Sequence, residues 1–302
     1  MTGLAATGAP FTVGTPILNF GIFAFFVVVT LVIAVSAAGR NRSTNDYYAG
    51  GRAFTGWQNG IAIGGDYLSA ASFLGIAGII ALAGYDGFLY SIGFLVGWLL
   101  VLLLVSEPLR NTGRYTMADV IDLRLRAVPV RAAAAISTLT VSLFYLLAQM
   151  AGAGALVSLL LGVSSTAGQD IVVAVVGLLM IFYVMVGGMK GTTWVQIVKA
   201  SILAAGAAVT TLWVLSKAGF SLSALLQHAA SASPAGSAVL GPGLEYGVNT
   251  VSKFDFISLA IALVLGTAGL PHVLMRLYTV PNAREARRSV VWTIWVVGLF
   301  YL

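Results

Sequence analysis

Long apolar stretches without a charged side chain constrain the fold of this sequence more than any other feature. The longest are 1–39, 67–85, 87–106, 132–169, 171–189, 200–216 and 256–275. Most of them reach the roughly 20 apolar residues that an α-helix needs to cross the hydrocarbon core of a bilayer. The chain is 59% hydrophobic and only 9% charged, with a mean hydropathy of +0.97, which is far from the composition of a soluble domain. We therefore expect an all-α polytopic membrane protein.

The same stretches predict where the helices lie. We expect eight, at about 16–38, 56–83, 87–107, 130–161, 170–188, 193–217, 254–277 and 287–302. The segment 218–253 is rich in Ser, Ala, Gly and Pro and is predicted to form one long outer loop. Leu302 falls in the middle of a span, with no helix stop signal before it. We therefore expect the chain to be the N-terminal fragment of a longer protein.

Basic residues are distributed unevenly over the loops between these spans. Of the 16 Lys and Arg residues, only Lys217 and Lys253 fall on one side of the expected membrane. Because cytoplasmic loops carry the excess of basic residues, the N-terminus is predicted to lie outside. No basic region precedes the first apolar run, so we expect a true membrane helix there and no secretory signal. A multi-pass protein of a bacterial inner membrane fits this pattern.

Several other classes of function are excluded by the residue types present. The net charge of +6 is accounted for by topology, so no nucleic-acid partner is needed. The chain has no cysteine and only two histidines, so a thiolate metal site and a structural zinc site are excluded. It also has no phosphate-binding glycine loop and no Ser/His/Asp constellation. We expect neither a cofactor nor an enzymatic activity.

Polar residues interrupt the second span at Gly64-Gly65-Asp66-Tyr67-Leu68-Ser69-Ala70-Ala71-Ser72. An ionisable residue at mid-membrane usually marks an ion or substrate path, and glycines permit a break where the backbone lines a cavity. Asp66 is interpreted as a cation ligand or proton carrier, with a solvated vestibule carboxylate as the alternative. Ser69 and Ser72 are interpreted as substrate ligands, with hydrogen bonding between packed helices as the alternative.

A second interruption, Gly266-Thr267-Ala268-Gly269-Leu270-Pro271-His272, lies inside the span 254–277. Proline suits the first position of a helix, so we expect unwinding near Thr267–Leu270 and a half-helix that starts at Pro271. Two interrupted spans five helices apart are typical of an inverted repeat with a central binding site. The candidate substrate residues here are Thr267, Gly269, Leu270, Pro271 and His272.

Three polar residues in the spans have two interpretations each. His272 is interpreted as a donor to a bound anion or as a satisfied residue that holds the broken helix together. Arg276 is interpreted as a topological anchor or as one half of an intracellular gate ion pair. Gln149 lines the pathway or makes a hydrogen bond in the core.

At these residues the sequence resembles the sodium/solute symporter family, and within it the cation/acetate branch. The matching segments are Asn45–Gly51, DYLSAASFLGIAG at 66–78, Gly84–Gly87, Tyr115–Val120, Ala148–Gly154, Gly187–Met189, Thr192–Gln196 and GTAGLPHVLMR at 266–276. The likeness covers nearly the whole chain from Asn45 onward.

This resemblance implies a fold like that of the sodium-coupled leucine transporter, with five-plus-five inverted repeats and one extra N-terminal helix at 16–38. The chain 1–302 would be a single, incomplete transporter domain. Its first repeat would be 56–217, and its second would start at 254–302 and be truncated. In the family a sodium ion binds backbone carbonyls of the first core helix, which here would be those of Gly65 and Leu68.

The function that follows is cation-coupled uptake of acetate or a related short monocarboxylate by alternating access, with Na⁺ or H⁺ as the coupling ion and the lipid bilayer as the surroundings. Relatives that transport proline carry an aspartate where Tyr67 stands, so Asp66 does not inherit that role directly. The rival interpretation is a transporter-like membrane sensor that feeds a signalling module.

Overall fold

The computed structural model describes residues 14–38, 43–113, 115–123, 125, 127–163 and 165–301. All regular structure in these segments is helical. The α-helices are α1 (Pro16–Ala38), α2 (Thr44–Ala49), α3 (Gly56–Tyr67), α4 (Ala70–Ala83), α5 (Phe88–Leu100), α6 (Ser106–Asn111), α7 (Met117–Ile121), α8 (Ala127–Leu161), α9 (Thr166–Lys217), α10 (Leu222–Ala232), α11 (Thr250–Gly269), α12 (Pro271–Leu274) and α13 (Ala283–Tyr301). Short 3-10 or π segments connect them, among them η2 (Gly84–Gly87), η3 (Val101–Val105), η4 (Gly236–Leu240) and η5 (Met275–Tyr278).

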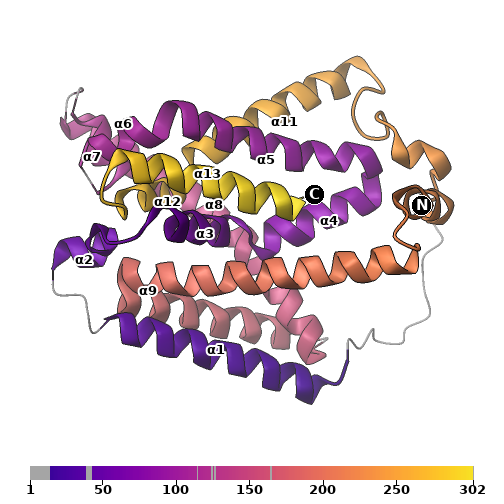
Figure 1. Cartoon of the computed structure of the whole chain (residues 1–302), viewed down its shortest axis with the longest axis horizontal. Helices are drawn as coiled ribbons and strands as arrows, with labels where there is room; N and C mark the ends of the chain where they lie inside the picture. The colour runs from indigo at the N-terminus through magenta and orange to yellow at the C-terminus, as the bar shows by residue number, and fades with distance from the viewer. Residues whose placement is uncertain are drawn as a thin grey trace.

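Five helical segments of the described chain are long and apolar enough to cross a membrane: Pro16–Ala37, Ser72–Asn111, Val128–Leu161, Thr166–Lys217 and Thr250–Tyr278. The 52-residue α9 folds back at Gly188, where φ is 53° and ψ is −160°. Its two arms lie side by side next to α1 (Figure 1). These arms correspond to the two separate helices predicted from the apolar runs. The prediction of an all-α polytopic membrane protein is confirmed.

Helices α3 and α13 pack closely because glycines line one side of α3. A Cβ atom on Gly60 would lie 2.4 Å from the Cβ of Trp292, and one on Gly64 would lie 2.8 Å from Cγ1 of Val296. Hydrogen bonds strengthen this contact, since the Thr293 hydroxyl donates to the Gly60 carbonyl at 3.1 Å. Small residues allow the close backbone approach that stabilises helix pairs in membranes.

Both predicted helix breaks are present, and the second is narrower than expected. The first lies at Leu68 and Ser69, which have extended backbone angles between α3 and α4. The second lies at Leu270, where ψ is 109° between α11 and α12, and Pro271 starts the next helix as predicted. Thr267 and Gly269 remain helical, so the predicted unwinding over Thr267–Leu270 is wrong in extent. A single residue with an extended ψ is enough to end the hydrogen-bond ladder.

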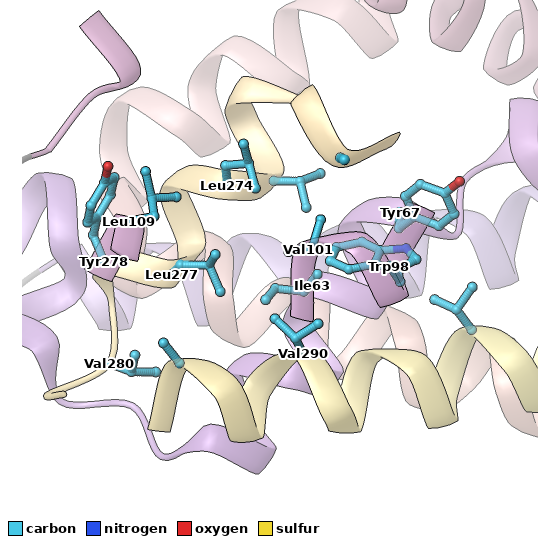
Figure 2. Packing of buried hydrophobic residues seen from close by; sticks show 14 of the residues in the cluster. Ile63, Tyr67, Trp98, Val101, Leu109, Leu274, Leu277, Tyr278, Val280 and Val290 are labelled. Atoms are coloured by element: carbon cyan, nitrogen blue, oxygen red, sulfur yellow. The ribbon is translucent and has the colours of Figure 1, made fainter. Parts of the chain in front are cut away.

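The broken helices meet in one apolar core. Leu274 and Leu277 of α12 and η5 pack with Ile63 of α3, Trp98 of α5 and Val290 of α13 (Figure 2). Trp98 is 1% exposed and is among the largest fully buried side chains. The segment after the second break is therefore held by side-chain packing, whereas α4, after the first break, starts at the Ser69 cap.

The segment predicted as an outer loop is partly ordered against the turn between α4 and α5. The Asp86 carboxylate accepts backbone N–H bonds from Gly243 at 3.1 Å, Glu245 at 2.8 Å and Tyr246 at 3.1 Å. The Tyr246 hydroxyl also lies 3.0 Å from the Tyr90 hydroxyl. A surface helix, α10, lies inside this segment.

Candidate functional site

A cavity of about 700 Å³ lies between the two helix breaks. Its walls come from α3, α4, α5, α8 and α11. The lining residues are Tyr67, Ser69, Ser72, Gly75, Ile76, Ile79, Tyr90, Phe94, Val141, Tyr145, Ala148, Gln149, Ala262, Leu263, Gly266, Thr267, Gly269 and Leu270. Segments about 200 residues apart in the chain thus share one site, since the Tyr67 and Thr267 hydroxyls lie 3.3 Å apart.

Most of the predicted substrate residues border this cavity. Ser69 and Ser72, at the first break, and Thr267, Gly269 and Leu270, at the second, are among its lining residues. Pro271 and His272 are not among its lining residues. Pro271 is buried at the first position of α12. The His272 ring packs against the Tyr145 ring, with 4.6 Å between the centroids.

Ser69 and Ser72 form a reciprocal capping box at the start of α4. The Ser69 N–H donates to Oγ of Ser72 at 2.9 Å, and the Ser72 N–H donates to Oγ of Ser69 at 3.3 Å. In an uninterrupted helix these two N–H groups would donate to the carbonyls of Gly65 and Leu68, four residues earlier. The capping box therefore diverts the donors that those two carbonyls would otherwise have.

The Asp66 side chain pairs with Arg276 and not with a group that lines the cavity. Arg276 donates to both carboxylate oxygens of Asp66, from Nε to Oδ2 and from Nη2 to Oδ1 at 3.2 Å. Nη1 of Arg276 also donates to the Thr193 hydroxyl at 2.7 Å. The pair is nearly enclosed, with side-chain exposures of 4% for Arg276 and 13% for Asp66. It ties α3 to η5 and to the second arm of α9, and neither residue lines the cavity.

Gly65, whose carbonyl is predicted to bind the cation, packs closely against the backbone of α9. A Cβ atom there would lie 2.3 Å from the backbone oxygen of Gln196. Leu68 is fully buried, and its N–H donates to the Gly64 carbonyl at 2.8 Å. The described residues contain no group of three or more His, Cys, Asp or Glu side chains suited to a metal ion.

Sequence reasoning missed the aromatic side chains of the cavity. Tyr67, Tyr90, Phe94 and Tyr145 all line it, and the Tyr67 ring makes edge contacts with the rings of Phe94 and Trp98. A signal was present in the spacing: Tyr90 and Phe94 share one helix face at i and i+4, as do Tyr145 and Gln149. Gln149, which the sequence left as either pathway or core, lines the cavity.

The chain is similar to proteins of a known family. Residues 47–302 match the model of the sodium:solute symporter family. A "Monocarboxylic acid transporter" of Corynebacterium glutamicum is 57% identical over 300 residues, which cover 96% of this chain and 54% of that protein. The "Uncharacterized symporter YwcA" of Bacillus subtilis is 52% identical over 283 residues, covering 94% of this chain and 54% of that protein. The chain thus spans about half the length of these curated relatives.

The fold is also that of a solved structure. A Na⁺-coupled sialic acid symporter, in a substrate-bound outward-open state, aligns with a TM-score of 0.73 at 18% identity, over 94% of this chain and 58% of that one. This likeness shows the fold. The match to the symporter family and the apolar helices together indicate a multi-pass protein of the cell membrane. The match to the family model extends over most of the chain and includes both helix breaks. The chain belongs to the sodium:solute symporter family.

Proposed function

We propose that the protein to which this chain belongs takes up short monocarboxylates, acetate among them, together with a cation. The observation that carries the proposal is the cavity bounded by both helix breaks. Transporters with inverted repeats bind their substrates at such discontinuous helices near the middle of the membrane. The C. glutamicum relative, named a monocarboxylic acid transporter, supports the substrate class.

The chemistry of the cavity suits a small, partly apolar anion. Its polar groups near the breaks include the hydroxyls of Ser69, Thr267 and Tyr145 and the amide of Gln149. Apolar side chains such as Ile76 and Phe94 make up much of the remaining wall. The N-terminal end of α4, a helix of 14 residues, adds the positive end of a helix dipole. We assign the carboxylate to this polar end and the short alkyl group to the apolar wall.

The cation site is proposed at the carbonyls of Gly65 and Leu68. Support comes from the capping box, in which the N–H groups of Ser69 and Ser72 donate to side chains. Hard cations such as Na⁺ prefer oxygen ligands, and backbone carbonyls at an unwound helix supply them in transporters. Whether Na⁺ or H⁺ is the coupling ion is decided by the experiment below. Alternating access would proceed by movement of one repeat bundle relative to the other around this site.

The test is uptake of labelled acetate by vesicles that contain the full-length protein. Sodium and proton gradients are imposed separately, and accumulation is expected to collapse when the gradient of the coupling ion is removed. When one cation moves with one monovalent anion, the pair carries no net charge, so a tenfold gradient of the coupling ion supplies about 1.4 kcal/mol and can concentrate the anion about tenfold. Absence of gradient-dependent uptake of any short monocarboxylate would contradict the proposal and favour the sensor interpretation.

A matched pair of variants tests whether the cavity holds the substrate. Gly266 lines the cavity, and a Cβ atom there meets nothing within 4 Å, so Gly266→Leu should fill the cavity without disturbing the packing. We expect the KM for acetate to rise at least about tenfold, because lost contacts of 1.4 kcal/mol correspond to that factor. Gly206→Leu on α9 is the control, since it also meets nothing within 4 Å and lies away from the cavity. Equal kinetics for the two variants would place the substrate elsewhere.

A further inference from the structure

Residues 236–247, called the strap from here on, lie against the turn between α4 and α5. At the start of the strap, η4 contacts η2 at the end of the bundle opposite to α2 and α7 (Figure 1). The contact is close, because a Cβ atom on Gly84 would lie 2.1 Å from the carbonyl oxygen of Val239. The φ angle of Gly84 is 58°, which residues with a side chain rarely adopt. The strap and the turn therefore fit together only with glycine at this position.

Asp86 fixes the other end of the strap. The residue is 1% exposed. Its Oδ2 atom accepts N–H bonds from Gly243 at 3.2 Å, Glu245 at 2.8 Å and Tyr246 at 3.1 Å. Burial of a carboxylate is costly unless it is hydrogen-bonded, and bonds to a charged acceptor are about twice as strong as neutral ones. The backbone of the strap is therefore held in a defined position beside α5.

The side chain of Tyr246 connects the strap to two helices that form the cavity. Its hydroxyl lies 3.0 Å from the hydroxyl of Tyr90, near the start of α5. Its ring packs against the ring of Phe256 in α11, with 5.8 Å between the centroids. Tyr90 lines the cavity, and so do residues of α11. Tyr246 therefore joins two parts of the cavity wall that belong to different segments of the chain.

The contact between the two tyrosines lies at one end of the cavity. On α4 the lining residues run from the Ser69 cap to Ile79, and a helical stretch of this length covers about 15 Å. Helix α4 ends at Ala83 and is joined to α5 by η2. Ile79 and Tyr90, on either side of this turn, therefore line the end of the cavity that is nearest to the strap.

We propose that Tyr246 closes the cavity at the strap end by holding Tyr90 in place, so that a solute enters from this side when the two hydroxyls separate. The inference goes beyond the proposed function, because it concerns access to the cavity and not the identity of the substrate. Tyr246 is a positioning residue in this role, since it acts through Tyr90 and is not among the lining residues. Because Asp86 fixes the backbone N–H of Tyr246, the tyrosine stays in position for the contact to form again.

The experiment measures how fast a cysteine in the cavity is modified. Gly75 lines the cavity, and a Cβ atom there meets nothing within 4 Å, so Gly75→Cys is the reporter in a full-length protein without other cysteines. The reagent is a charged methanethiosulfonate that does not cross membranes. It is applied to the side of the membrane on which Ser231→Cys, in the α10 helix before the strap, reacts. Tyr246→Phe should raise the rate of modification about fivefold, the factor by which one hydrogen bond typically changes an equilibrium.

A double-variant comparison shows whether the two hydroxyls act as a pair. Tyr90→Phe removes the other hydroxyl and should raise the rate by the same factor. Tyr90→Phe/Tyr246→Phe should raise it no further, because the two residues share one interaction. Tyr183→Phe is the matched control and should leave the rate unchanged. It removes a hydroxyl that lies 2.6 Å from the Thr30 hydroxyl, and neither of these residues lines the cavity.

Two results would overturn the inference. One is a reporter that reacts at the same rate, or not at all, with and without the Tyr246 hydroxyl. The other is additive effects of the two substitutions, which would show that the hydroxyls act separately. If Tyr246→Phe does not fold, Tyr90→Phe gives the same measurement. The test does not use acetate, so a wild-type protein that fails to transport acetate would overturn the proposed function alone.

Discussion

At the scale of single residues, Asp66 shows how a charge inside the membrane is compensated. Its carboxylate and the Arg276 guanidinium are 210 residues apart in the chain and form a bidentate pair that Thr193 extends. Arg276 had two interpretations from the sequence, an anchor or one half of a gate ion pair, and the structure gives it Asp66 as its partner. The partner could not be identified from the sequence, because no local pattern connects positions so far apart.

This pair leads to a prediction about stability. Asp66→Asn should lower the stability of the folded protein by about 3–5 kcal/mol, because the buried Arg276 would lose its compensating charge. The double variant Asp66→Asn/Arg276→Gln should recover much of this loss, since both charges are then removed together. The measurement is the thermal midpoint of the purified full-length protein in detergent for the two single variants and the double variant.

The opposite pattern would support Asp66 as a cation ligand. In that case Asp66→Asn would keep its thermal midpoint and lose the dependence of uptake on the coupling ion. Arg276→Gln would then change stability little, and the double variant would show no recovery.

At the scale of the helices, glycine has a different role from the one that the sequence suggested. The sequence predicts that Gly64 and Gly65 permit the first break, yet both lie inside α3. Their lack of a side chain allows contact with α13 and with α9. The break itself is set by the extended Leu68 and the Ser69 cap. A glycine in a membrane helix can serve either purpose, and only the neighbouring helices distinguish the two.

The close packing between the glycines of α3 and helix α13 can be tested by adding one methyl group to α3. Gly60→Ala would place a Cβ atom 2.4 Å from the Cβ of Trp292 and 2.6 Å from the Ser289 carbonyl oxygen. The helices would have to separate, and overpacking of this kind costs about 1–3 kcal/mol. Gly78→Ala on α4 is the control, because its Cβ atom would meet nothing within 4 Å. We expect a lower thermal midpoint for Gly60→Ala alone; equal midpoints would show that α3 and α13 can shift at little cost.

The elements themselves were largely predictable, because the run of apolar side chains that must match the hydrocarbon thickness is visible in the sequence. The predicted span 16–38 and the start of a helix at Pro271 agree with α1 and α12. The cavity was predictable only in part. Ser69 and Thr267 stand next to visible helix breakers, whereas Tyr90 and Tyr145 reach the cavity through the packing of α5 and α8, which depends on contacts across the whole bundle.

At the scale of the whole molecule, the orientation of the bundle in the membrane stays a prediction from the positive charges, and the chain offers a clean way to test it. It contains no cysteine, so a cysteine introduced into a full-length protein made cysteine-free beyond these residues would react without background. Ser231→Cys, at the exposed end of α10, should react in intact cells with a maleimide that does not cross membranes. Leu123→Cys, exposed beside α7, should react only after the cells are opened, because the basic residues around it favour the cytoplasmic side. If only Leu123→Cys reacted in intact cells, the orientation would be the opposite of the predicted one. The Asp86 turn and its partners in 243–246 would then lie on the inner side.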